Sequence, residues 1–89
     1  MKTENFPHLA AFIQQSSKKL HVTRDELVRA TGMCSDKASA VWNGKDIRLS
    51  YYLAALKLLL KRSENPRYKL SSEQLLESFK QAITQDLSG

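Results

Sequence analysis

Cysteine and histidine are scarce in this chain, which has one Cys and two His among 89 residues. The single thiol, Cys34, excludes a disulfide within the chain, and His8 and His21 lack ligand partners at the spacing of a zinc site. The sequence also lacks a glycine-rich phosphate loop and a Ser or Cys with a plausible histidine partner. We therefore expect no metal, no cofactor and no enzymatic activity.

Glycine, proline and long apolar runs are also few. Three Gly and two Pro, with 42% hydrophobic and 26% charged residues, argue against a fibrous or disordered chain. No run approaches the roughly 18 apolar residues of a membrane span, and L-A-A-F-I near the N-terminus is too short for a secretory leader. We expect one folded, mostly helical domain over 1–89, located in the cytoplasm, with no membrane partner.

The chain does contain a pattern for two short helices around a glycine, in T-R-D-E-L-V-R-A-T-G-M-C-S-D-K-A-S-A-V-W-N-G at 23–44. Thr23 and Glu26 form the S/T-x-x-E capping box that begins the first helix, which we expect over 24–31. Gly32 can take the left-handed conformation that ends this helix. Two helices joined by so short a turn are typical of a helix-turn-helix.

The second of these helices is expected over 35–43. Ala38, Val41 and Trp42 recur in it at helical spacing and form its inner side. We expect Trp42 to be buried against the following helix rather than to stack on a base. For Cys34, a small residue that fills the turn is the expected role, and a redox sensor is the alternative.

These residues resemble the helix-turn-helix of the lambda-repressor-like family, the Cro and Xre regulators. The second helix of that family ends in an aromatic or acidic residue followed by Asn-Gly, here Trp42-Asn43-Gly44. The likeness extends back to L-H-V-T at 20–23 and forward through Y-Y-L-A-A-L-K-L-L-L at 51–60, and it fades after residue 62. The resemblance implies a compact all-α domain of five helices that binds double-stranded DNA and regulates transcription.

The resemblance also implies a site. In this family the second helix lies in the major groove, and its N-terminal residues touch base edges. The implied base contacts are from Ser35, Asp36, Lys37, Ser39 and Ala40, and the implied phosphate contacts are from Arg24 and Asn43. Asp36 can equally be a helix-start residue favoured by the dipole. Lys45 and Arg48, in the loop that follows, are further phosphate candidates, although such charges can equally serve solubility.

Two positions depart from the family pattern in opposite directions. The family usually has alanine where this chain has Val28, and a branched residue where it has Ala38. We hypothesise that the two side chains touch and have exchanged volume, which keeps the packing density near its native value. Thr31 stands where the family prefers leucine, which predicts a slightly thinner core.

Three further helices are expected, each with residues that can cap its N-terminus. Their ranges and caps are 5–20 with Asn5, 51–62 with Ser50, and 71–88 with Ser71 and Gln74. His21 is expected to end the first of them in a left-handed conformation. Residues 5–63 would then form the DNA-binding core, followed by an amphipathic helix at 71–88.

The apolar stripe of the 71–88 helix fits two roles. It can complete the core of one chain or pair with its twin in a homodimer, and amphipathicity does not separate these roles. The residues of a dimer interface would be Leu76, Phe79, Ile83 and Leu87. A repressor that reads a two-fold operator, with half-sites about 34 Å apart, would use such a dimer.

Charge divides the chain unevenly. Residues 1–69 carry 13 Lys and Arg against 6 Asp and Glu, or +7, and residues 70–89 carry 1 against 3, or −2, which together give the net charge of +5. The positive charge of residues 1–69 is consistent with a surface that binds phosphates. The competing interpretation is an adaptor or antitoxin-like module that binds a partner protein through residues 70–88.

Overall fold

Five helices follow one another along residues 4–88, the part of the chain that the computed structural model describes. They are α1 (Pro7–Leu20), α2 (Arg24–Thr31), α3 (Ser35–Asn43), α4 (Leu49–Ser63) and α5 (Ser72–Ser88). No strand occurs in this range, where an isolated bridge joins Glu4 to Ile47. The radius of gyration, 12.2 Å, equals the value of about 12 Å expected for a compact domain of this length. The predicted compact all-α fold of five helices is confirmed.

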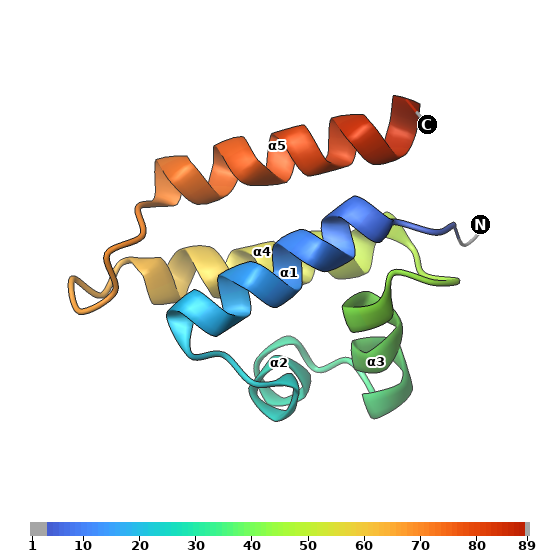
Figure 1. Ribbon diagram of the computed structural model, residues 1–89. Helices are drawn as coiled ribbons and strands as arrows, with labels where there is room; N and C mark the ends of the chain where they lie inside the picture. The colour runs from blue at the N-terminus through green and yellow to red at the C-terminus, as the bar shows by residue number, and fades with distance from the viewer. Residues whose placement is uncertain (1–3, 89) are drawn as a thin grey trace.

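The helices form three levels (Figure 1). α1 and α4 pack side by side in the middle, α5 covers both of them on one side, and α2 and α3 lie on the other side. None of these helices combines the length and the apolar character that crossing a membrane requires.

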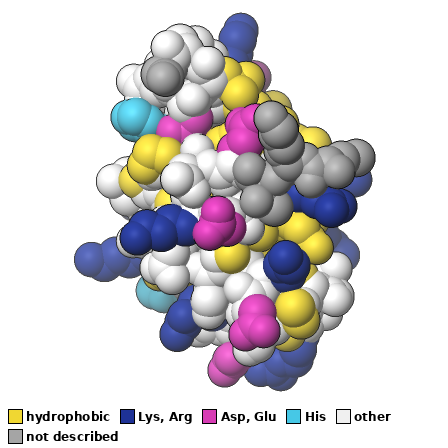
Figure 2. Space-filling view, turned by 90° about the vertical axis from the view of Figure 1, so that its right-hand side faces the viewer, with side chains coloured by type: hydrophobic (Ala, Val, Ile, Leu, Met, Phe, Trp, Pro, Cys, Tyr) yellow, Lys and Arg dark blue, Asp and Glu magenta, His cyan; other side chains and the backbone are white. Residues whose placement is uncertain are grey.

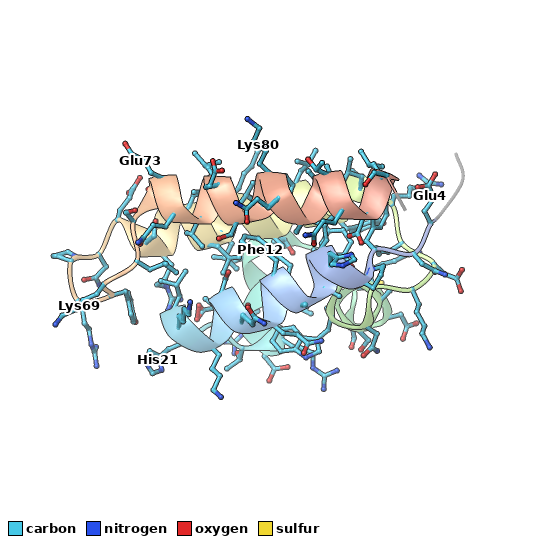
Figure 3. The ribbon with its side chains drawn as sticks, turned by 45° about the horizontal axis from the view of Figure 1, so that its top comes forward. Glu4, Phe12, His21, Lys69, Glu73 and Lys80 are labelled. Atoms are coloured by element: carbon cyan, nitrogen blue, oxygen red, sulfur yellow. The ribbon has the colours of Figure 1, made fainter. Side chains whose placement is uncertain are left out.

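The core lies where α1, α4 and α5 meet. Leu9 and Ile13 of α1, Tyr52 of α4 and Leu75 of α5 are each at most 1% exposed. Phe12 of α1 lies between the two front helices in Figure 3 and meets Phe79 of α5 edge to face, with ring centroids 5.8 Å apart. Burial of one such side chain stabilises a fold by about 1.5–3 kcal/mol. One face of α5 therefore belongs to the core of the single chain.

Several predicted helix ends are confirmed. The Thr23 hydroxyl accepts from the amide of Glu26 at 3.1 Å, and Ser71 and Gln74 cap α5 reciprocally, at 3.1 and 3.2 Å. His21 follows α1 with a φ of 55°. These ends depend on residues within one turn of each other, which is why sequence spacing predicts them.

Gly44 ends α3 for a reason that the sequence alone does not contain. Its φ is +71°, and a Cβ at this position would lie 2.7 Å from the Phe6 carbonyl oxygen and 2.8 Å from Ala10 Cβ. The Phe6 amide also donates to the Gly44 carbonyl at 2.8 Å. Glycine is therefore required both by the turn and by the close approach of the N-terminal segment.

The predicted caps Asn5 and Ser50 are wrong. α1 begins at Pro7 after Phe6, and the Asn5 side chain instead accepts from the amide of Asp46 at 3.1 Å. α4 begins two residues earlier than expected, so Ser50 lies inside its first turn. The bridge between Glu4 and Ile47 explains the first difference, because it fixes the N-terminal segment against the loop that precedes α4.

Candidate nucleic-acid interface

α2 and α3 are joined by a turn of three residues, 32–34. Figure 1 shows α2 nearly along its axis and α3 from the side, so the two helices cross steeply. Leu27 of α2, Met33 of the turn and Val41 of α3 are buried in the common core. The Tyr52 hydroxyl of α4 also donates to the Val41 carbonyl at 2.8 Å. The pair of helices is therefore held to the body by apolar packing and by a buried hydrogen bond.

The outer side of α3 follows from the burial of its inner side. Ala38 and Val41 are 1% and 0% exposed, and at 100° per residue the opposite side of the helix carries Asp36, Ala40 and Asn43. Asp36 and Asn43 are exposed, and Ala40 is partly buried. This outer side is made of short side chains.

Ser39 and Lys37 lie on the two flanks of that outer side, 160° apart across it. Both are partly buried, whereas Ser35 in the first turn is exposed. The Arg24 guanidinium donates to the Ser39 hydroxyl at 3.4 Å, so the structure brings these two predicted residues together. The start of α2 thereby presents a cation beside the middle of α3.

Lys37 is held on the α4 side. Its Nζ lies 5.8 Å from the centroid of the Tyr51 ring, within the range of a cation–π contact. The Arg24 and Lys37 cations therefore border α3 on opposite sides, with an uncharged strip and Asp36 between them.

Lys45 and Arg48 follow the C-terminal end of α3, and both are exposed. Asp46, between them, has a φ of +51°, and its amide bond to Asn5 holds this loop. Arg48 borders a hollow with Glu4 and Leu87 at the start of α4. The two cations therefore lie beyond the end of α3, and Arg48 shares the lining of its hollow with an acid.

An open hollow of about 760 Å³ adjoins α3 on the Arg24 side. It lies between the second half of α1, the start of α2 and the end of α3, and its lining includes Gln14, Gln15, Lys18, Thr23, Arg24 and Trp42. The α1 residues of this lining are not among those predicted from the sequence. Their spacing on the polar face of a helix marks them as exposed, but only the packing of three helices brings them to Arg24.

Trp42 lies differently from the expected position. It is partly buried rather than enclosed against α4, and one side of it lines this hollow. The Gln14 side chain donates to its carbonyl oxygen at 2.6 Å, which joins α1 to the end of α3. Cys34 is exposed at the start of α3 and does not fill the turn as expected.

The charges around the site are mixed. Figure 2 shows the end of the molecule that carries α3 and the chain termini, with Lys and Arg side chains separated by Asp and Glu. Glu26 in the first turn of α2 is paired with Arg62 of α4, and the same guanidinium donates to the Leu20 carbonyl at 3.3 Å. This pairing offsets the charge of one acid near Arg24 and links α4 to the corner between α1 and α2.

Within residues 4–88, no three His, Cys, Asp or Glu side chains are grouped so as to hold a metal ion. Comparison of the chain with family models, with curated proteins and with solved structures finds no match.

Proposed function

We propose that this protein binds duplex DNA with α3 in the major groove and regulates transcription as a repressor on a two-fold symmetric operator. The observation that carries the proposal is the uncovered outer side of α3, bordered by Arg24 on one flank and Lys37 on the other. A helix with one buried side and one free side of short residues can approach base edges closely.

The dimensions support this arrangement. A helix with its side chains is about 10–12 Å across, and the major groove is about 12 Å wide, so a helix such as α3, with nine residues, can enter it. Ala40 can meet a thymine methyl, Lys37 can donate to guanine, and Asp36 can accept from the amino group of cytosine. The outer side of α3 thus carries the chemistry of direct base readout.

Phosphate contacts are assigned to the residues beside α3. Arg24 and Lys18 line the hollow next to it, together with the amides of Gln14 and Gln15 and the Thr23 hydroxyl. Cations and neutral donors of this kind contact phosphates without reading sequence. We therefore assign the hollow to the DNA backbone, and Lys45 and Arg48 to phosphates beyond the end of α3.

The test is binding to duplex DNA selected from a random pool, measured by fluorescence anisotropy at several salt concentrations. Arg24→Ala and Lys18→Ala should each weaken binding and reduce the slope of log K against log salt by about 1, because each removes one phosphate contact. Lys69→Ala is the matched control, since it removes the same charge from the connector between α4 and α5, away from α3 (Figure 3). A chain without duplex affinity at low salt, or three variants with the same slope, would contradict the proposal.

A second function is favoured by a separate observation. Leu76 and Leu87 of α5 are 48% and 63% exposed, as expected of a helix that binds another protein. An adaptor or antitoxin-like module would use this surface on a partner protein and would not need α3. Retained partner binding in a chain that fails the DNA measurement would favour this alternative.

A further inference from the structure

An indole and two cations share the open hollow between α1, α2 and α3. Its volume of about 760 Å³ lies within the range of about 300–1,000 Å³ that small-molecule sites occupy. The assignment to the DNA backbone uses the two cations, Lys18 and Arg24, and the neutral donors of the lining. It gives no role to Trp42, which is the single tryptophan of the chain and lines the same hollow with a partly buried side chain.

Arg24 reaches the hollow close to Trp42. Its guanidinium donates to the Ser39 hydroxyl at 3.4 Å, and Ser39 precedes Trp42 by three residues in α3. Residues three apart in a helix are neighbours on one face. The charge of Arg24 therefore lies on the side of α3 that carries Trp42.

Lys18 reaches the hollow from α1. The Gln14 side chain donates to the Trp42 carbonyl oxygen at 2.6 Å, and Lys18 follows Gln14 by four residues in α1. Residues four apart also share one helix face, and both of these side chains line the hollow. The two cations thus approach Trp42 from two different helices.

The charge of the hollow has one sign. Among residues 4–88, none of those that line it is an acid. Glu26, two residues after Arg24, is paired with Arg62 of α4. Two cations without a neighbouring acid in the lining favour an anionic ligand. The indole and the side chain of Val22 add apolar surface to the same lining, which favours a ligand with a flat ring.

We infer that this hollow binds a nucleoside monophosphate, with its base against Trp42 and its phosphate between Lys18 and Arg24. Every base has a π-face that stacks on an aromatic side chain, and Lys and Arg donate charge-assisted hydrogen bonds to phosphate. The exposed Gln15 amide, which both donates and accepts, suits the polar edge of a base. A phosphate alone would leave the indole without a contact, and a neutral ring would leave both cations unpaired.

The position of the site has a regulatory consequence. Lys18 and Arg24 are also the residues assigned to DNA phosphates, so a bound nucleotide and duplex DNA exclude each other. This consequence rests on the proposed function, whereas nucleotide binding itself does not. By linkage, the nucleotide weakens DNA binding by the same factor by which DNA weakens nucleotide binding. The nucleotide therefore releases the protein from its operator.

The test uses Trp42 as the reporter, because no other tryptophan contributes to the fluorescence. AMP, GMP, CMP and UMP are titrated into the full chain without DNA, and at least one should quench this fluorescence with a Kd of about 1 mM or below. Adenosine or the matching nucleoside, and ribose 5-phosphate, are then measured by competition and should each bind at least about tenfold more weakly. Absence of quenching by all four nucleotides up to about 10 mM, or equal affinity for either fragment, would overturn the inference.

Variants locate the ligand. Lys18→Ala and Arg24→Ala should each raise the Kd of the nucleotide about fivefold or more, because each removes a charge-assisted contact to the phosphate. Both side chains are exposed, so circular dichroism should show an unchanged helix content. Lys80→Ala, on α5 at the far side of the α1–α4 level, is the matched control and should leave the Kd unchanged (Figure 3). A Kd that neither of the first two variants changes would overturn the site.

Calorimetry replaces fluorescence for substitutions of Trp42. Trp42→Phe keeps a ring and should retain measurable binding, whereas Trp42→Leu lacks a ring and should lose about tenfold or more in affinity. Equal affinities of these two variants would show that no base stacks at this position. If Trp42→Leu does not fold, the titrations of Lys18→Ala and Arg24→Ala still decide the inference.

Competition with DNA is measured separately. A saturating concentration of the quenching nucleotide, added to the anisotropy titration, should raise the Kd for selected duplex about tenfold or more. An unchanged duplex Kd would overturn the mutual exclusion. Because the nucleotide titrations contain no DNA, a chain that binds the nucleotide but no duplex contradicts only the proposed function, and a chain that binds duplex but no nucleotide contradicts only this inference.

Discussion

Asp86, near the end of α5, caps the start of α1 at His8. Its carboxylate accepts from the backbone amides of His8 and Leu9 at 3.0 and 2.9 Å, and from the His8 ring Nδ1 at 2.8 Å. The carboxylate side chain is wholly enclosed, with 0% exposure. α1 has no capping side chain next to it in sequence. The first amides of α1 are therefore satisfied by a residue that lies 77 positions from Leu9 in the sequence.

Replacement of Asp86 by alanine should destabilise the fold by about 2 kcal/mol, because two helix-terminal amides lose a charged acceptor. Urea unfolding followed by circular dichroism measures this change. Gln85→Ala, at an exposed neighbouring position, is the control and should cost less than about 0.5 kcal/mol. Equal effects of the two substitutions would show that the cap contributes nothing.

The two glycines that end α2 and α3 should respond differently to alanine. Both have a positive φ, +76° at Gly32 and +71° at Gly44, but a Cβ at Gly32 meets nothing within 4 Å. Gly32→Ala should therefore cost only the conformational strain, about 1 kcal/mol. Gly44→Ala adds a clash with backbone and should cost more than about 2 kcal/mol. Thermal unfolding of both variants compares them, and a smaller loss at Gly44 would contradict the close approach to Phe6.

Tyr52 should make the fold sensitive to alkali. Burial, together with the charge of Asp86, raises the pKa of the Tyr52 hydroxyl well above its usual range. The folded state then favours the neutral phenol, so this contribution is complete below the ordinary tyrosine pKa of about 10 and is lost as the pH rises beyond it. The difference in melting temperature between wild type and Tyr52→Phe, measured from pH 8 to 11, isolates this group from the other titrating residues.

Below pH 10 the Tyr52→Phe variant should be less stable by about 1 kcal/mol, since the Val41 carbonyl loses its donor. The gap should narrow as the pH rises above about 10. A constant gap across this range would mean that Tyr52 does not resist ionisation.

Val28 and Ala38 should be coupled if they have exchanged volume across one contact. Ala38 is 1% exposed, and Val28 is partly buried against the same core. Val28→Ala and Ala38→Val should each destabilise the fold, by about 1 kcal/mol or more. The double variant should regain at least about 0.5 kcal/mol relative to the sum. Strictly additive losses in chemical unfolding would show that the two side chains do not touch.

Lys37 should affect specificity more than general affinity. If it donates to guanine, Lys37→Gln should weaken selected DNA by about 1–3 kcal/mol and leave unrelated duplex nearly unchanged. Lys45→Gln should weaken both duplexes alike, because it removes a phosphate contact only. Anisotropy titrations on the two DNAs measure the difference, and equal losses for Lys37→Gln would assign it to the backbone.

Sequence spacing predicted the features that nearby residues determine. Thr23 with Glu26, and Ser71 with Gln74, cap their helices as expected, since each pair lies within one turn. The cap of α1 was not predictable in this way, because Asp86 reaches it only after α5 has packed. The same reason explains the error at Asn5, whose side chain is taken by the amide of Asp46.

In the candidate site, too, local features could be predicted from the sequence and features that depend on packing could not. Periodicity alone indicated which residues of α3 face outward, because the inner side is marked by Ala38 and Val41. It did not indicate the hollow lined by Lys18 and Trp42, which exists only where three helices converge. Nor did it separate Phe79, which is buried, from Leu76, which is exposed. Both lie on the same apolar stripe of one amphipathic helix, and only the position of α1 and α4 decides between them.

Arg62 holds the corner between α1 and α2 through the Leu20 carbonyl and the Glu26 carboxylate. Opening this corner would break a hydrogen bond and an ion pair together, so α2 and α3 are expected to keep their orientation relative to the body. On the proposed function, a domain with this fixed orientation would adapt little to an irregular groove. The DNA would then have to deform instead, and duplexes that bend easily at the centre of the operator should be favoured at positions that no side chain touches.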